Sequence, residues 1–129
     1  MNARASNAGA TAPSPTARAE DPRDHALRVQ GLRAGYGRGG DIVCGIDLAQ
    51  KPESIITVIG PNGSGKSSFI KTLAGLLPTR AGTVSVTGRD ITTLSPARRV
   101  ASGLAYVPQE ANVFASLTIA ENLKLSTEF

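Results

Sequence analysis

A glycine-rich loop in the middle of the chain constrains the fold more than any other feature. Residues 60–67 read Gly-Pro-Asn-Gly-Ser-Gly-Lys-Ser, a complete G-x-x-x-x-G-K-[ST] pattern. The loop follows an apolar, β-like run, 54–59, and precedes a run with helical spacing, 68–74. A strand, a glycine loop and a helix in this order form the setting in which the pattern binds phosphate groups. The sequence therefore predicts an α/β fold with a phosphate site at this junction.

The residue types of the loop suit a dense cluster of negative charge. Glycine adopts positive φ and lets successive backbone N–H groups turn inward. The helix that starts near Gly65 adds its unpaired first N–H groups and the positive end of its dipole. Lys66 would place its charge on the β and γ phosphates, and Ser67 would offer its hydroxyl to Mg²⁺. The candidate phosphate-binding residues are Gly60, Pro61, Asn62, Gly63, Ser64, Gly65, Lys66, Ser67 and Ser68.

Length and composition limit the other classes of protein. The chain has 129 residues, of which 40% are apolar, and this suffices for one domain with a modest core. The formal net charge is +4, but the basic residues are scattered among acids and Trp is absent, which disfavours a nucleic-acid-binding module. No apolar run approaches the roughly 18 residues that span a membrane. The single cysteine, Cys44, lies in an apolar stretch and is expected to be reduced and buried.

The first 25 residues have the composition of a disordered tail. They are rich in Ala, Ser, Thr, Pro and Arg and lack hydrophobic periodicity. An organelle-targeting peptide is the alternative, although two arginines in the first nineteen residues make a poor basic face. His25 is expected to be solvated at the edge of this tail. We therefore divide the chain into a tail, 1–25, and one ordered unit, 26–129.

Hydrophobic patterning predicts the elements around the loop. Strands are expected at 27–32, 41–48, 83–87 and 104–107, and the continuous apolar run 54–59 predicts a strand that is covered on both faces. The helix after the loop should pack one face on the sheet through Phe69, Ile70, Leu73, Ala74 and Leu77. Ser95 and Pro96 predict a short surface helix over 96–102, which carries Arg98 and Arg99. A capping box at 118–121 should start a helix that runs through Leu125.

Three matched positions make residues 27–126 resemble the ATP-binding subunits of ABC transporters. Gly35-Tyr36-Gly37 is similar to the family's aromatic loop, and the resemblance implies that Tyr36 stacks on adenine, although this tyrosine could simply pack a glycine turn. The glycine loop at 60–67 has the sequence that this family usually shows for the G-x-x-x-x-G-K-[ST] motif. Residues 106–109, Tyr-Val-Pro-Gln, are similar to the family's Q-loop. This implies that Gln109 touches Mg²⁺ or its water and transmits the nucleotide state to a membrane partner, whereas spacing alone favours an ordinary loop residue.

The sequences of three further segments point to one subgroup of this family. Residues 88–92, 103–109 and 112–123 look like the ATPases of branched-chain amino-acid importers and their urea or amide relatives. The resemblance implies ATP and Mg²⁺ as cofactors, ATP hydrolysis, integral-membrane permease subunits and a second ATPase subunit as partners, and no nucleic acid. It also implies a peripheral location on the cytoplasmic face of the inner membrane. Residues that recognise the cargo lie in other subunits, so this chain does not identify the cargo.

The implied fold is a P-loop NTPase core of RecA type with an N-terminal antiparallel β subdomain. The chain departs from the family's pattern at 52–54, where it reads Pro-Glu-Ser instead of proline-glycine-glutamate. If this turn needs positive φ, Glu53 is strained by about 1 kcal/mol or more.

The sequence also ends at Phe129, before the family's serine-glycine-glycine signature, the acidic Walker B strand with its catalytic glutamate, and the switch histidine. We therefore expect a truncated ABC ATPase domain with unpaired strand edges. In it, Lys66 stabilises phosphate charge and no general base is present, so that turnover by this polypeptide alone should be small.

Two other functions stay open from the sequence. One is a nucleotide-binding fragment without hydrolytic activity. The other is a small P-loop phosphoryl transferase, which would need an acceptor site and lid arginines. Arg98 and Arg99 are the only adjacent arginine pair, and their place on a predicted surface helix disfavours this second function.

Overall fold

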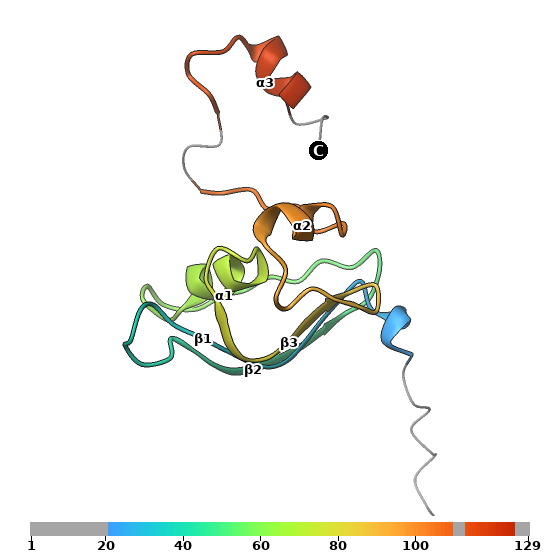
Figure 1. Cartoon of the computed structure of the whole chain (residues 1–129), viewed down its shortest axis with the longest axis vertical. Helices are drawn as coiled ribbons and strands as arrows, with labels where there is room; N and C mark the ends of the chain where they lie inside the picture. The colour runs from blue at the N-terminus through green and yellow to red at the C-terminus, as the bar shows by residue number, and fades with distance from the viewer. Residues whose placement is uncertain (1–20, 110–112, 126–129) are drawn as a thin grey trace, which may run out of the picture.

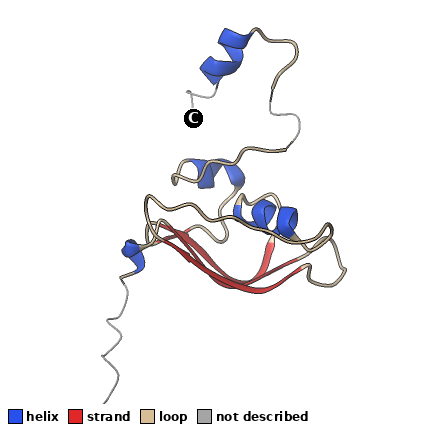
Figure 2. Ribbon diagram, turned by 180° about the vertical axis from the view of Figure 1, so that it is seen from behind, coloured by secondary structure: helices blue, strands red, loops and turns tan. Residues whose placement is uncertain are grey.

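A computed structural model describes residues 21–109 and 113–125 of the chain. A curved sheet carries the helices α1 and α2 on its concave side, while α3 lies away from the sheet (Figure 1). Figure 2 shows the same two layers from behind. In chain order the elements are η1 (Pro22–Asp24), β1 (Leu27–Ala34), β2 (Val43–Gln50), α1 (Lys66–Leu73), β3 (Thr79–Val86), β4 (Arg89–Asp90), α2 (Pro96–Val100) and α3 (Ile119–Leu125).

The four strands form one antiparallel sheet in the order β2-β1-β3-β4. β1 is central and pairs with both β2 and β3. The register shifts between Val29 and Leu32, where Gly31 has a φ of 55°. This irregularity resets the alternation of side chains, so both Val29 and Leu32 are buried although they are three residues apart. The antiparallel β subdomain that the sequence predicts is therefore present.

The core lies between the concave face of the sheet and α1. Phe69 and Leu73 of α1, and Leu77 just after it, are buried. Their spacing of four residues places them on one face, as the sequence predicts, and Ala74 is buried as well. The prediction is wrong for Ile70, which is 36% exposed, because it follows Phe69 directly and so points roughly 100° away around the helix. They belong to one buried cluster with residues of the sheet and of the turn after it, namely Val29, Leu32, Ala34, Val43, Val84, Val86 and Ile91.

Two predicted strands, 54–59 and 104–107, do not form strands in the structure. Residues 54–59 are exposed throughout, with Ile55 at 94% and Ile59 at 86% exposure. A strand needs a neighbour that satisfies its N–H and C=O groups. Within residues 21–109 and 113–125, no segment pairs with either run. The prediction is wrong for this chain. An apolar run has the composition of a buried strand, but it forms a strand only when a neighbouring strand accepts and donates its backbone hydrogen bonds.

Two further side chains lie in environments opposite to those predicted. Cys44 is exposed, because it alternates along β2 with the buried Val43. His25 is only 2% exposed, whereas the sequence predicts a solvated residue. The physical reason is that strand-like pairing begins next to it: the N–H of Ala26 donates to Gln50 O, and Ala26 O accepts from the N–H of Thr87. Of the predicted tail, residues 1–20 lie outside the described residues.

Local sequence signals at two turns are reproduced by the structure. Glu53 has a φ of 57°, so the position where the family has glycine does lie in the left-handed region. An L-residue there is strained by about 1 kcal/mol or more, as expected. The capping box is also confirmed, because the N–H of Thr118 donates to Glu121 Oε2 at 2.8 Å and the N–H of Glu121 donates to Thr118 Oγ1 at 3.3 Å.

Arg99 is buried at 2% exposure and is not on a surface, which corrects the expectation for the pair at 98–99. Its Nη1 donates to Thr72 O at 2.8 Å and to Leu73 O at 2.7 Å. Its Nε and Nη2 donate to carbonyl oxygens in the turn before α2, at 3.0 and 2.6 Å. Carbonyls at the end of a helix lack helical partners and carry negative charge, so the guanidinium is a natural partner for them. Burial lowers the pKa of Arg99, and the charge of Asp90 opposes this shift.

We predict that Arg99→Ala lowers the free energy of unfolding by about 3 kcal/mol, because it removes the guanidinium donors from several carbonyls, of which Thr72 O keeps the N–H of Gly75. The matched control is Arg98→Ala, since Arg98 is adjacent and exposed, and its effect should stay within about 0.5 kcal/mol. Urea denaturation followed by circular dichroism measures both values. Equal effects of the two substitutions would show that the contacts of Arg99 contribute nothing.

Candidate functional site

The glycine loop joins the exposed segment 54–59 to the first residue of α1. Gly63 and Gly65 have φ values of 82° and 90°, in the left-handed region that glycine adopts without strain. Gly65 precedes α1 directly, and its carbonyl accepts the N–H of Phe69 at 2.8 Å. A Cβ on Gly65 would lie 3.2 Å from both Cγ2 and the carbonyl oxygen of Ile42. Position 65 therefore requires glycine for two reasons: the backbone has a positive φ, and a Cβ would lie too close to Ile42.

The first turn of α1 offers open backbone donors. The N–H groups of Lys66, Ser67 and Ser68 have no carbonyl partner in the described part of the chain. Such groups, together with the positive end of the helix dipole, form an anion-binding site. The local structure thus provides the donors that the sequence predicts at this junction.

Lys66 folds back over the loop that precedes it. Its Nζ donates to Gly60 O and to Pro61 O, both at 2.7 Å. An ammonium group has three donors, so a third remains for another acceptor. Residues 60–64 are exposed, and the positive charge therefore lies at an accessible loop.

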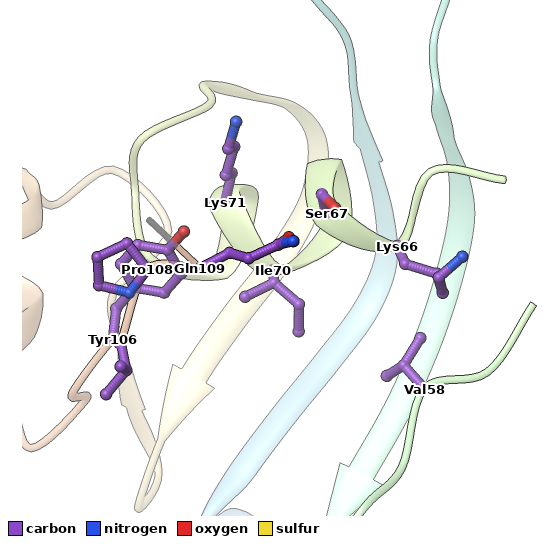
Figure 3. Close-up of a pocket in the computed structure, with 9 residues that line it drawn as sticks. Val58, Lys66, Ser67, Ile70, Lys71, Tyr106, Pro108 and Gln109 are labelled. Atoms are coloured by element: carbon purple, nitrogen blue, oxygen red, sulfur yellow. The ribbon is translucent and has the colours of Figure 1, made fainter. Parts of the chain in front are cut away.

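Two pockets share Lys66, Ser67 and Gln109. One has a volume of about 560 Å³ and the other about 350 Å³. Figure 3 shows the larger pocket, in which Gln109 reaches along α1 toward the end that carries Ser67. The smaller pocket is lined by the loop residues Asn62, Gly63 and Gly65 and by Ser68, together with Ile42. The fold thus brings Gln109 to the phosphate loop, although the two are far apart in the sequence.

Tyr36 lies outside both sets of pocket-lining residues. It belongs to the loop 35–42 between β1 and β2 and is 52% exposed. A half-exposed aromatic ring can accept a flat ligand on its face. The structure therefore brings together the loop residues and Gln109, and it leaves Tyr36 on a separate, accessible part of the surface.

Sequence reasoning missed a charged cluster around Asp41, near the end of the Tyr36 loop. Asp41 accepts from Arg33 Nε at 2.7 Å and from Arg80 Nη1 at 2.9 Å. Hydrogen bonds from Arg33 and then Arg80 hold the pKa of Asp41 below its ordinary value, and burial partly opposes this. No sequence signal could identify this cluster, because Arg80 is about forty positions from its partners and belongs to no motif.

We predict that Asp41→Asn is more destabilising at neutral than at acidic pH. Because the folded state has the lower pKa, ionised Asp41 stabilises it above the unfolded pKa of about 4. That contribution is lost as the pH falls through the folded pKa. Unfolding free energies of wild type and Asp41→Asn, measured from pH 7 to pH 3, should therefore converge on acidification. A difference that grows as the pH falls would contradict the assignment.

We also predict that Gly65→Ala destabilises the protein more than Gly63→Ala. Both residues have positive φ, which costs alanine about 1 kcal/mol at either position. A Cβ on Gly63 meets nothing within 4 Å, whereas one on Gly65 meets Ile42. We expect losses of about 1 kcal/mol for Gly63→Ala and about 2 kcal/mol or more for Gly65→Ala in urea denaturation. Equal losses would show that Ile42 yields without cost.

The oxygen donors at the site fit Mg²⁺. No group of three or more His, Cys, Asp and Glu side chains gathers within the described ranges, so a cage made only of protein ligands is not found there. Mg²⁺ usually keeps several waters and binds substrate phosphates with only one or two protein ligands. The Ser67 hydroxyl and the Gln109 amide oxygen line the same pockets and match that requirement.

The sequence pattern of the ABC transporter family matches residues 43–129. The chain therefore belongs to the family of ABC transporter ATP-binding domains. It is similar to "Probable branched-chain amino acid transport ATP-binding protein LivF" of Archaeoglobus fulgidus, at 46% identity over 100 residues, covering 78% of this chain and 42% of the relative. It is also similar to a sulfate/thiosulfate import ATP-binding protein of Mycolicibacterium paratuberculosis, at 38% identity, covering 71% of this chain and 25% of the relative.

Solved structures show the same fold. An ATP-binding subunit of an ABC transporter superimposes with a TM-score of 0.67 at 28% identity, covering 78% of this chain and 41% of that one. An ATP-binding cassette of an ABC transporter gives a TM-score of 0.57 at 28% identity, covering 68% and 36%. The chain thus spans less than half the length of the relatives it matches.

None of the helices that the structure describes has the length and hydrophobicity needed to cross a bilayer.

Proposed function

We propose that this chain forms the ATP-binding region of the ATPase subunit of an ABC transporter. The observation that carries the proposal is the meeting of Lys66, Ser67 and Gln109 at the open first turn of α1. A polyphosphate placed there would gain backbone N–H donors, the helix dipole and an ammonium group. Among the described residues that line the two pockets, Lys66 and Lys71 are the charged ones, so their charge complements phosphate.

Each predicted site residue then has a specific task. Residues 60–68 would enclose the phosphates, with the open N–H groups of the first turn of α1 as donors, and Lys66 would stabilise charge on the β and γ phosphates. Ser67 and Gln109 would hold Mg²⁺, which neutralises the phosphates when it is bound. Tyr36 would supply a face for the adenine ring.

We infer the function of the whole protein from its family and relatives. A subunit of this kind would hydrolyse ATP together with a second ATPase subunit and would drive integral-membrane permease subunits. The relative named for branched-chain amino acid transport makes such amino acids, or related small solutes, the favoured cargo. The subunit would then lie peripherally on the cytoplasmic face of the inner membrane.

Lys66→Ala should weaken the binding of Mg-ATP at least tenfold, because it removes a charge-assisted contact to phosphate. The control Lys51→Ala changes an exposed lysine near the glycine loop in sequence that lines neither pocket, and it should leave affinity unchanged. Isothermal titration calorimetry measures both affinities. Equal affinity of Lys66→Ala and wild type would remove the basis of the proposal.

A second candidate is nucleotide binding without hydrolysis by this chain alone. It is favoured by the pockets' lining, which consists of neutral and basic residues in the described part of the chain. Release of inorganic phosphate from Mg-ATP distinguishes the two candidates. Turnover by wild type that disappears in Lys66→Ala supports an active hydrolase, and binding without turnover supports the second candidate.

A further inference from the structure

We propose that Arg80 is a positioning residue for adenine, because it holds the loop that carries Tyr36. This inference rests on the proposed function, and Arg80 itself would not touch the nucleotide. Arg80 is the second residue of β3, and its side chain is 29% exposed. It lies on a different strand from both ends of the Tyr36 loop.

The guanidinium of Arg80 spans the backbone of the Tyr36 loop. Its Nη2 donates to Gly37 O at 2.7 Å and to Tyr36 O at 3.4 Å. Its Nη1 donates to Gly39 O at 2.7 Å. One side chain therefore binds three carbonyl groups, that of the aromatic residue itself and those of two glycines that follow it. Only arginine combines a planar fork with enough donors for this arrangement.

Arg80 is itself held in place from two sides. Asp41 Oδ1 accepts from its Nη1 at 2.9 Å. Gly35 lies close to the guanidinium, since a Cβ there would be 3.2 Å from Arg80 Cζ and 2.4 Å from Gly40 O. The loop backbone, the Arg80 guanidinium and the Asp41 carboxylate thus pack together. This packing requires a residue without a side chain at position 35.

The loop needs such support because of its composition. Residues 35–40 read Gly-Tyr-Gly-Arg-Gly-Gly, and glycine loses more conformational freedom on ordering than any other residue. Among these six residues, the one backbone hydrogen bond that the structure gives runs from the N–H of Gly39 to Tyr36 O at 3.2 Å. A loose loop would have to be ordered whenever the Tyr36 ring stacks on a base, and this would weaken binding. Arg80 orders the loop on folding, before any ligand binds.

The test distinguishes the contribution of the adenine base to binding affinity from that of the phosphates. We compare the affinities of Mg-ATP and Mg-tripolyphosphate, which lacks a base, for wild type, Arg80→Ala and Arg80→Lys by calorimetry. Arg80→Ala should weaken ATP binding about tenfold, within the range that base stacking contributes. It should leave tripolyphosphate binding within twofold. Arg80→Lys should lie between, because an ammonium group lacks the fork that binds three carbonyls.

Arg33→Ala is the matched control. Arg33 also binds Asp41, at 2.7 Å, but it donates to none of the loop carbonyls in the described structure. Its substitution should leave the affinities for both ligands unchanged. In a Tyr36→Ala background, Arg80→Ala should have no further effect on ATP binding, because the ring that it positions is gone.

The outcomes are distinct. Equal weakening of both ligands by Arg80→Ala, or no weakening of ATP binding, would overturn the positioning role. If wild type binds Mg-tripolyphosphate as tightly as Mg-ATP, the nucleoside adds no affinity. This result would overturn the positioning role of Arg80 but would not contradict the proposed phosphate site. Failure of wild type to bind either ligand would refute the proposed function itself, and this inference with it.

Discussion

The packing of one face of α1 against the concave side of the sheet holds the candidate site in place. Phe69 and Leu73 anchor the helix in the core, and the glycine loop is attached directly to the first residue of that helix. The loop therefore needs few contacts of its own. Ile42, next to the β2 strand, provides one of them by lying against Gly65. An apolar core thus fixes the position of a polar, exposed loop, which lets the loop keep its backbone groups open.

Two different devices order the two candidate binding loops of the molecule. The phosphate loop is ordered by its connection to a packed helix and by the conformations of its glycines. The Tyr36 loop has no such helix, and a side chain from β3 binds its carbonyls instead. The first device is local in sequence, while the second joins residues about forty positions apart. This difference explains why only the first could be found from a motif.

The predictable features were those that a short stretch of sequence determines by itself. The capping box at Thr118 and the spacing of Phe69 and Leu73 depend on neighbouring residues, and the structure agrees with both. The positive φ at Glu53 is suggested only by comparison with the family's pattern, because glutamate itself disfavours that conformation. The features that failed depend on distant partners. Residues 54–59 carry the pattern of a covered strand but have no strand beside them in the described structure. Arg99 reads as a surface residue until the end of α1 is placed against it.

The two ends of α1 differ in how the protein compensates the helix dipole. At its carboxyl end, the buried Arg99 guanidinium donates to the Thr72 and Leu73 carbonyls, so little uncompensated negative potential remains there. The helix has only eight residues, about 12 Å, so its two opposite poles lie close together and partly offset one another. With one pole compensated by the protein, the other acts nearly as an isolated positive pole. An anion at the glycine loop would compensate the amino end of the helix, as the buried arginine already compensates the carboxyl end.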